Sequence, residues 1–129
     1  MKQVSKNSIL DIKEILNEYS NDIQLAITKK AEETAKYGAE RLKHTSPKRK
    51  GKYSKGWRVK TIKGKGFVNS TIYNATNWQL THLLEKSHVI KNSNGTYGIS
   101  KPQVHIEPVE QECISKYEQE VENIIKNGD

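Results

Sequence analysis

Residues 45–77 have the sequence TSPKRKGKYSKGWRVKTIKGKGFVNSTIYNATN, and this stretch decides the organisation of the chain. It opens with a basic segment, residues 45–56, in which proline and glycine indicate turns. From Trp57 onward apolar and charged side chains alternate, which predicts a strand with one buried face. Gly64-Lys65-Gly66 predicts a tight turn, and residues 67–73 are rich in β-branched and aromatic side chains. The stretch therefore predicts a basic loop followed by an antiparallel hairpin.

The net charge of +7 comes from one part of the chain. No Asp or Glu lies between Glu40 and Glu85, whereas this window holds 11 of the 22 Lys and Arg residues. The other 11 basic residues stand against all 15 acidic ones. Like charges this close repel one another unless an opposite charge lies nearby, so we expect the segment to face a partner. The candidate interface or assembly residues are Lys48, Arg49, Lys50, Lys52, Lys55 and Arg58.

Before the basic loop, apolar residues recur at steps of three and four from Ile9 to Leu42, which predicts a long N-terminal helix ending near His44. A continuous helix of that length would span about 54 Å, too long for a compact domain of this size. Either it breaks near Asn21, because a second cap within Ser20-Asn21-Asp22 could split it, or part of it projects toward another subunit. The small residues that permit close approach of a packed partner are Ala31, Ala35, Gly38 and Ala39.

After the hairpin, Thr76-x-x-Gln79 has the pattern of a capping box and predicts a short helix reaching about Ser87. Asn94-Gly95 is a strong hairpin signal between residues 88–91 and 97–100. Pro108 suits the first turn of a C-terminal helix.

The predicted fold class is therefore α+β, with a long N-terminal helix, a small antiparallel sheet of two hairpins, a short middle helix and a C-terminal helix. At 129 residues we expect a single domain over residues 1–129, with residues 1–7 flexible and a basic loop over 45–56.

Composition limits the kind of protein. Only 33% of residues are hydrophobic and the mean hydropathy is −0.85, so a lone monomer would be marginally stable and neighbours are expected to stabilise it. Cys113 is the only cysteine, which excludes an intramolecular disulfide and a thiolate metal cluster. No apolar run is long enough to span a membrane, and a reducing cytoplasm suits the chain.

Catalytic and metal-binding patterns are weak. The four histidines, at positions 44, 82, 88 and 105, have no metal-ligand spacing, so structural or surface roles are favoured. Glu85 follows His82 by three residues, a spacing typical of a surface pair on a helix. No serine lies in a nucleophile elbow, and Cys113 falls on the apolar stripe of the last helix. We expect no cofactor and no enzymatic activity.

Three interpretations of the basic window stay open. It could bind nucleic acid, with lysines on phosphates and Tyr53 and Trp57 stacking on bases, although no groove-reading motif accompanies the charge. It could be a solvated loop. It could also contact another subunit, because residues 102–129 hold seven acids against two lysines. A metal-dependent nuclease would require the histidines and Glu85 to gather in one pocket.

Three short motif segments follow one another in the chain, at residues 46–51 (SPKRKG), 83–88 (LLEKSH) and 102–109 (PQVHIEPV). Their order resembles that of a family, the small neck proteins of long-tailed bacteriophages, also called tail-completion, head–tail joining or tail-component proteins. The family pattern is a long helix, an Ala-Pro-x-x-Thr-Gly turn, a basic strand and hairpin, a Glu-Phe-Gly-Thr-like segment, and a Pro-rich opening of the last helix. Lys50 replaces the usual Thr, and Lys86-Ser87 replace Phe-Gly-Thr. The family-motif positions are Pro47, Gly51, Trp57, Glu85, Pro102 and Pro108.

This resemblance extends from about Ile9 to Ile125 and implies a non-enzymatic structural protein of the virion. Such proteins form homo-oligomeric rings, often six-fold, in the neck of the particle. Their partners are the head connector or adaptor on one side and the tail terminator or tube on the other, and they assemble in the host cytoplasm. The alternative is a small basic nucleic-acid-binding module.

Overall fold

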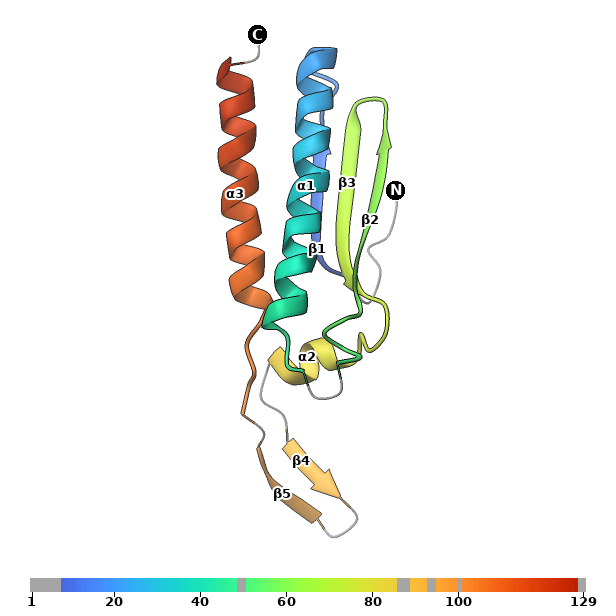
Figure 1. Ribbon diagram of the computed structural model, residues 1–129, viewed down its shortest axis with the longest axis vertical. Coiled ribbons are helices and arrows are strands. Elements are labelled where there is room, and N and C mark those ends of the chain that lie inside the picture. The colour runs from blue at the N-terminus through green and yellow to red at the C-terminus, as the bar shows by residue number, and fades with distance from the viewer. Residues whose placement is uncertain (1–7, 49–50, 86–88, 93–94, 100, 128–129) are drawn as a thin grey trace.

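A computed structural model describes residues 8–48, 51–85, 89–92, 95–99 and 101–127. Single helices separate a first strand and two strand pairs along the chain, an α+β arrangement (Figure 1). In chain order the elements are β1 (Ser8–Ile15), α1 (Asn21–Thr45), β2 (Trp57–Gly64), β3 (Phe67–Asn74), α2 (Leu80–Glu85), β4 (Val89–Asn92), β5 (Gly95–Ile99) and α3 (Ile106–Asn127).

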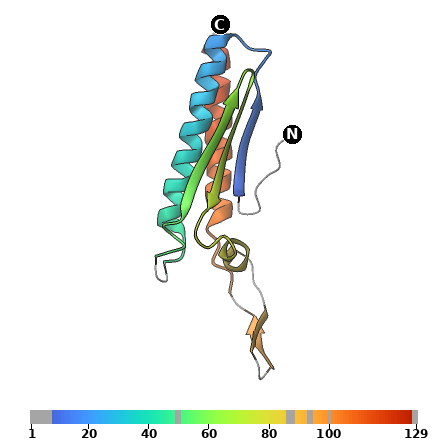
Figure 2. The ribbon, with the colours of Figure 1, turned by 90° about the vertical axis from the view of Figure 1, so that its right-hand side faces the viewer.

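The main sheet is antiparallel, with strand order β1-β3-β2. In the central strand β3, Val68, Ser70, Ile72 and Asn74 are buried, whereas the residues between them are more exposed. Because successive side chains of a strand point to opposite faces, this alternation means that one face is covered and the other is open. α1 lies over β2 and β3, and α3 packs beside α1 and reaches β1. Figures 1 and 2 show both helices on the same side of the sheet.

α1 is held against both the sheet and α3 by small residues. Ser20 caps its start, with the hydroxyl accepting a hydrogen bond from the Ile23 amide at 3.3 Å. A Cβ at Gly38 would lie 2.7 Å from Ile72 Cδ1 and 2.8 Å from Cys113 Sγ, so only glycine allows contact with β3 and α3 at once. The expected role of the small residues is confirmed, since the following are buried: Ala31, Ala35, Gly38 and Ala39.

The prediction of one long helix from Ile9 was wrong over its first part, because residues 8–15 form strand β1. Ile9, Ile12 and Leu16 have helical spacing, but Leu10 and Ile12 also fit the two-residue period of a strand. Pairing with β3 decides between these possibilities: Ile12 lies opposite Ser70 and is 7% exposed. Ile15, which a helix would place on the same face, is 74% exposed. The predicted break near Asn21 is confirmed.

The remaining elements agree with prediction in type but differ in detail. Both hairpins form, but in two separate sheets instead of one, and β1 is a third strand of the first. The middle helix begins at Leu80, so the predicted capping box at Thr76 was wrong: the Thr76 hydroxyl donates to the carbonyl of Lys52 instead. The β4–β5 hairpin extends away from the body (Figure 1). Asn94 of the predicted turn lies outside the described residues.

The strand assignment of β1 gives a direct test. Ile12→Ala is expected to lower the free energy of unfolding by about 2–4 kcal/mol, because it opens a cavity beneath the sheet. Ile15→Ala should change it by no more than about 0.5 kcal/mol, because that side chain is exposed. Denaturant titration of both variants measures the difference. Equal losses would place both residues on one helical face and contradict the strand.

Candidate functional site

The basic loop joins the end of α1 to β2, at the end of the body where α2 lies (Figure 1). Lys48, Lys52 and Lys55 are exposed, whereas Arg49 and Lys50 lie outside the described residues. Arg58 is exposed on β2, and its Nη1 donates to the carbonyl oxygens of Lys55 at 2.7 Å and Trp57 at 3.0 Å. The loop therefore presents its cations to solvent while its backbone is fixed from within.

Carboxylates on the helices neutralise part of the positive charge at and near the acid-free stretch between Glu40 and Glu85. Arg41 pairs with Glu112 at 3.5 Å, Lys43 with Glu40 at 3.0 Å, and Lys63 with Glu32 at 3.3 Å. These pairs are exposed, and each contributes little to stability. Within the described ranges, the cations of the window that make no ion pair are Lys48, Lys52, Lys55, Arg58, Lys60 and Lys65.

Buried hydrogen bonds attach the loop to α1. The indole Nε1 of Trp57, which is 1% exposed, donates to Ser46 Oγ at 2.8 Å. The Ser46 hydroxyl in turn donates to the Leu42 carbonyl in the last turn of α1. Gly51 has a φ of +80°, a conformation that glycine adopts most readily, and so turns the chain between these points. Trp57, the first residue of β2, is thus linked through Ser46 to the last turn of α1.

Tyr53 connects the loop to the strand and to α3. Its carbonyl accepts a hydrogen bond from Asn74 Nδ2 at 2.9 Å. Its hydroxyl lies 2.7 Å from His105 Nε2, and both side chains are buried. Burial raises the pKa of the Tyr53 hydroxyl, which therefore keeps its proton. His105 Nδ1 lies 2.7 Å from the Gln103 carbonyl, which only accepts, so Nδ1 carries the hydrogen and Nε2 accepts from Tyr53.

Glu85 caps α3 from another part of the chain. Its Oε1 accepts from the amides of His105 at 2.8 Å and Ile106 at 2.9 Å, and its Oε2 accepts from Glu107 at 2.9 Å. These amides have no partner within the helix, and the helix dipole favours a carboxylate there. Partial burial alone would raise the pKa of Glu85, but the three amides and the neighbouring His105 hold it below its usual value.

The three motif segments, remote in sequence, therefore meet at one junction. Tyr53, two residues after the first motif, bonds to His105 of the third, and Glu85 of the second motif bonds to residues 105–107. Pro102 is exposed before α3, and Pro108 is exposed in its first turn. Sequence reasoning identified Trp57 and Glu85, considered Tyr53 only for stacking on bases, and expected a structural or surface role for His105. It assigned no role to Ser46 or Asn74. The position of His105 inside the third motif was the available signal.

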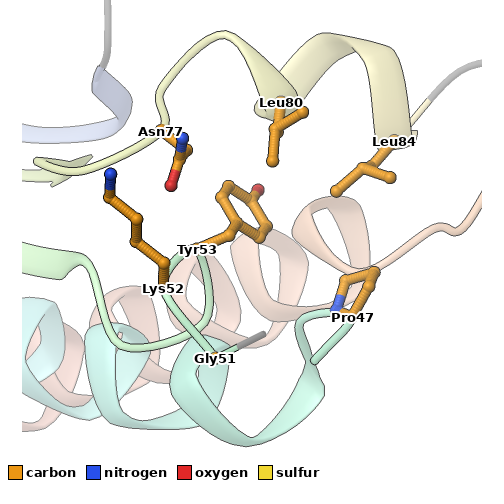
Figure 3. Close-up of a pocket in the computed structure, with 7 residues that line it drawn as sticks. All are labelled: Pro47, Gly51, Lys52, Tyr53, Asn77, Leu80 and Leu84. Atoms are coloured by element: carbon orange, nitrogen blue, oxygen red, sulfur yellow. The ribbon is translucent and has the colours of Figure 1, made fainter. Parts of the chain in front are cut away.

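A cavity of about 420 Å³ opens beside this junction (Figure 3). Leu80 and Leu84 of α2 and Tyr53 of the loop supply most of its apolar lining, while Lys52 and Asn77 supply polar groups. Pro47 and Gly51 complete the lining. Two of the family-motif positions thus border a hollow that accommodates an apolar side chain beside a positive charge.

The polar groups of the junction are arranged as hydroxyl, imidazole and carboxylate, an order that also occurs in nucleophilic sites. Here the hydroxyl is buried and keeps its proton, and both carboxylate oxygens bind helix amides. Among the described residues no three His, Cys, Asp or Glu side chains form a group that could hold a metal ion. His44 is exposed, and the contact expected between Glu85 and His82 falls outside the described side chains.

The family comparison agrees with this geometry. A family model described as "Bacteriophage HK97-gp10, putative tail-component" matches residues 11–86, more than half of the chain. The chain belongs to this family of bacteriophage tail components. The matched range contains most of β1, all of α1, the basic loop, β2, β3 and α2, and it ends one residue after Glu85. Membership associates the chain with the virion.

Neither a curated protein nor a solved structure matches the chain. None of the helices in the described part of the chain has the length and apolarity that crossing a bilayer requires.

Replacing the cap tests the role of Glu85. Glu85→Gln is expected to lower the free energy of unfolding at pH 7 by about 1–3 kcal/mol, because one accepting oxygen and the charge are lost. The pKa of Glu85 is lower in the folded state, so its stabilisation is present at neutral pH and is lost as the pH falls through the folded-state value. The difference between the wild type and the variant should therefore shrink below about pH 4.

Chemical denaturation across pH 2–7 measures this difference, within the range where carboxylates titrate. The matched control is Glu18→Gln, an exposed carboxylate in the turn before α1 that makes no ion pair among the described residues. Coincident stability curves for the two variants would show that Glu85 contributes no more than a surface carboxylate.

Proposed function

We propose that this protein is a non-enzymatic structural component of the phage neck that joins the head connector to the tail. The observation that carries the proposal is the family match over residues 11–86. Tail components act by contact with neighbouring subunits, and the exposed features of this chain suit that role. Its site of action would be the neck of the virion, after assembly in the host cytoplasm.

The composition supports assembly with neighbours. Only 33% of residues are hydrophobic, so a single copy can build only a small core, and neighbouring subunits would add to its stability. We infer a homo-oligomeric ring that contacts the head connector or adaptor on one side and the tail terminator or tube on the other.

The junction supports a structural role for the residues of the family motifs. Glu85, Trp57 and Gly51 stabilise a helix start, a helix end and a turn. They hold the described part of the loop and α2 around the 420 Å³ cavity. Residues already held by such bonds lose little conformational entropy when a partner docks, which favours assembly.

Removing the gene from the phage tests the proposal. Particles made without the protein are expected to accumulate as separate DNA-filled heads and free tails, because the joining layer is missing. Electron microscopy and plaque titres measure this, and the wild-type gene supplied in trans should restore joined particles. Infectious, fully joined virions from the deletion phage would overturn the proposed function.

A second candidate function is non-specific DNA binding, favoured by the exposed Lys48, Lys52 and Lys55, which make no ion pair within the described ranges. Phosphate contacts release counterions, so the affinity would fall steeply with salt. This candidate predicts a loss of affinity in Lys52→Glu/Lys55→Glu.

Titration of duplex and single-stranded DNA at two ionic strengths separates the candidates. The matched control is Lys29→Glu/Lys36→Glu, which reverses two exposed cations on α1, away from the loop. If DNA binding drives function, the loop variant should bind roughly ten-fold more weakly and with a smaller salt slope than the control. No binding at low salt, or equal loss in both variants, would remove the DNA-binding candidate.

A further inference from the structure

The main sheet has one face that no described helix covers (Figure 2). Residues directly opposite on antiparallel strands point to the same face, so the strand registers identify its members. Phe67, Asn69, Thr71 and Tyr73 of β3 alternate with the buried residues and therefore lie on this open face. Their partners on the neighbouring strands are Ile15, Lys13 and Asp11 of β1, and Gly64, Ile62, Lys60 and Arg58 of β2.

One end of the open face is apolar. Ile15 is 74% exposed and Phe67 is 38% exposed, although both are large aliphatic or aromatic side chains. With Ile62 they border a hollow of about 370 Å³ that Lys13 and Asn69 also line. Exposed apolar side chains gathered around a hollow indicate a surface that a partner covers.

The rest of the open face is basic. Lys13, Arg58 and Lys60 are exposed and make no ion pair in the part of the chain that is described. Two carboxylates lie at this face among the described residues. Asp11 accepts a hydrogen bond from the Thr71 hydroxyl, and Glu14, which also borders the α3 side, lines the edge of the hollow. The face therefore combines an apolar hollow with a positive field.

A second surface has the opposite charge. Along the side of α3 that faces β1, Tyr117, Val121 and Ile125 border a hollow of about 440 Å³, and Ile125 is 40% exposed. The charged residues around this hollow are Glu14, Glu118, Glu122 and Lys126. Lys126 pairs with Glu122 at 3.2 Å, which leaves the flank acidic. We call this surface the α3 flank.

Charge decides how two copies could use these surfaces. Two open faces packed together about a two-fold axis would bring both sets of Lys13, Arg58 and Lys60 into one interface, and like charges gathered there are unfavourable. The open face and the α3 flank differ in sign, and each has an apolar centre. Such a contact is heterologous, and repetition closes it into a ring or extends it into a filament.

We propose that the open face of one copy packs against the α3 flank of a second copy. This inference rests on the proposed function and supplies the contact between neighbouring copies. A second copy fits the open face better than DNA does, because phosphates would bind Lys13, Arg58 and Lys60 but would leave Ile15 and Phe67 exposed.

Charge reversal on each surface tests the contact. The face variant is Lys13→Glu/Lys60→Glu, and the flank variant is Glu118→Lys/Glu122→Lys. The matched control is Lys29→Glu/Lys36→Glu on the exposed side of α1. Circular dichroism and thermal unfolding establish that all three are folded. Sedimentation at about 0.1 M salt, where screening is moderate, gives the mass against concentration.

Wild type and control are expected to assemble alike. The face variant and the flank variant should each assemble roughly ten-fold or more weakly, because acid then meets acid or base meets base. An equimolar mixture of the two variants should recover assembly, since each reversed surface then finds its opposite in the other variant.

Three outcomes would overturn the contact: a flank variant that assembles like wild type, a mixture that does not recover assembly, or a wild type that stays monomeric at every concentration. A face variant that loses DNA binding but assembles normally would assign the open face to nucleic acid instead. These results are independent of the deletion phage, where intact virions would refute the neck function itself.

Discussion

The carboxylate of Glu85 binds the free amides at the start of α3, and the arrangement of the whole end of the molecule depends on this interaction. It connects the end of α2 to residues 105–107. Since His105 is thereby fixed, its imidazole can accept from Tyr53, whose backbone is bonded to Asn74 of β3. One acidic side chain therefore positions a helix, a loop and a strand whose residues are far apart in the sequence.

Ion pairs neutralise charges between the two long helices, whereas the cations of the loop and of the open sheet face are not neutralised by described residues. Where α1 and α3 pack together, Lys30 lies 2.9 Å from Glu120 and Arg41 lies 3.5 Å from Glu112. Beyond the helices the cations of the loop and of the open sheet face have no such partners in the described residues. The excess of positive charge expected from the composition is thus confined to particular surfaces, so the two sides of the subunit differ in charge.

Elements with strong local signals were predictable. Gly64-Lys65-Gly66, the alternation in residues 57–61 and the stripe around Val109 and Cys113 correspond to the β2–β3 hairpin and α3. β1 was not predictable, because Ile12 has neighbours at both periods and only pairing with β3 distinguishes them. The over-long helix, which had suggested a projecting element, therefore no longer supports assembly.

The candidate site, like the fold, could be predicted only in part from the sequence. Trp57, Glu85 and Gly51 could be singled out in the sequence because they match a family pattern. The hydrogen bonds that Trp57 and Glu85 make could not be predicted. Local spacing suggested only a pair between Glu85 and His82, whereas the described contacts of the Glu85 carboxylate are with backbone amides at least twenty residues further along. Contacts of this range depend on how α2 and α3 are placed, and no local pattern encodes that placement.

The buried thiol of Cys113 has a practical consequence. It is 0% exposed where α1 and α3 touch, and burial, followed by the neighbouring Glu112, raises its pKa to about 11. Since the thiolate is the reactive form, maleimide-type reagents can label it only when the two helices separate. Cys113 is the single cysteine of the chain, so its labelling, measured by mass spectrometry, reports separation of the two helices without an introduced cysteine.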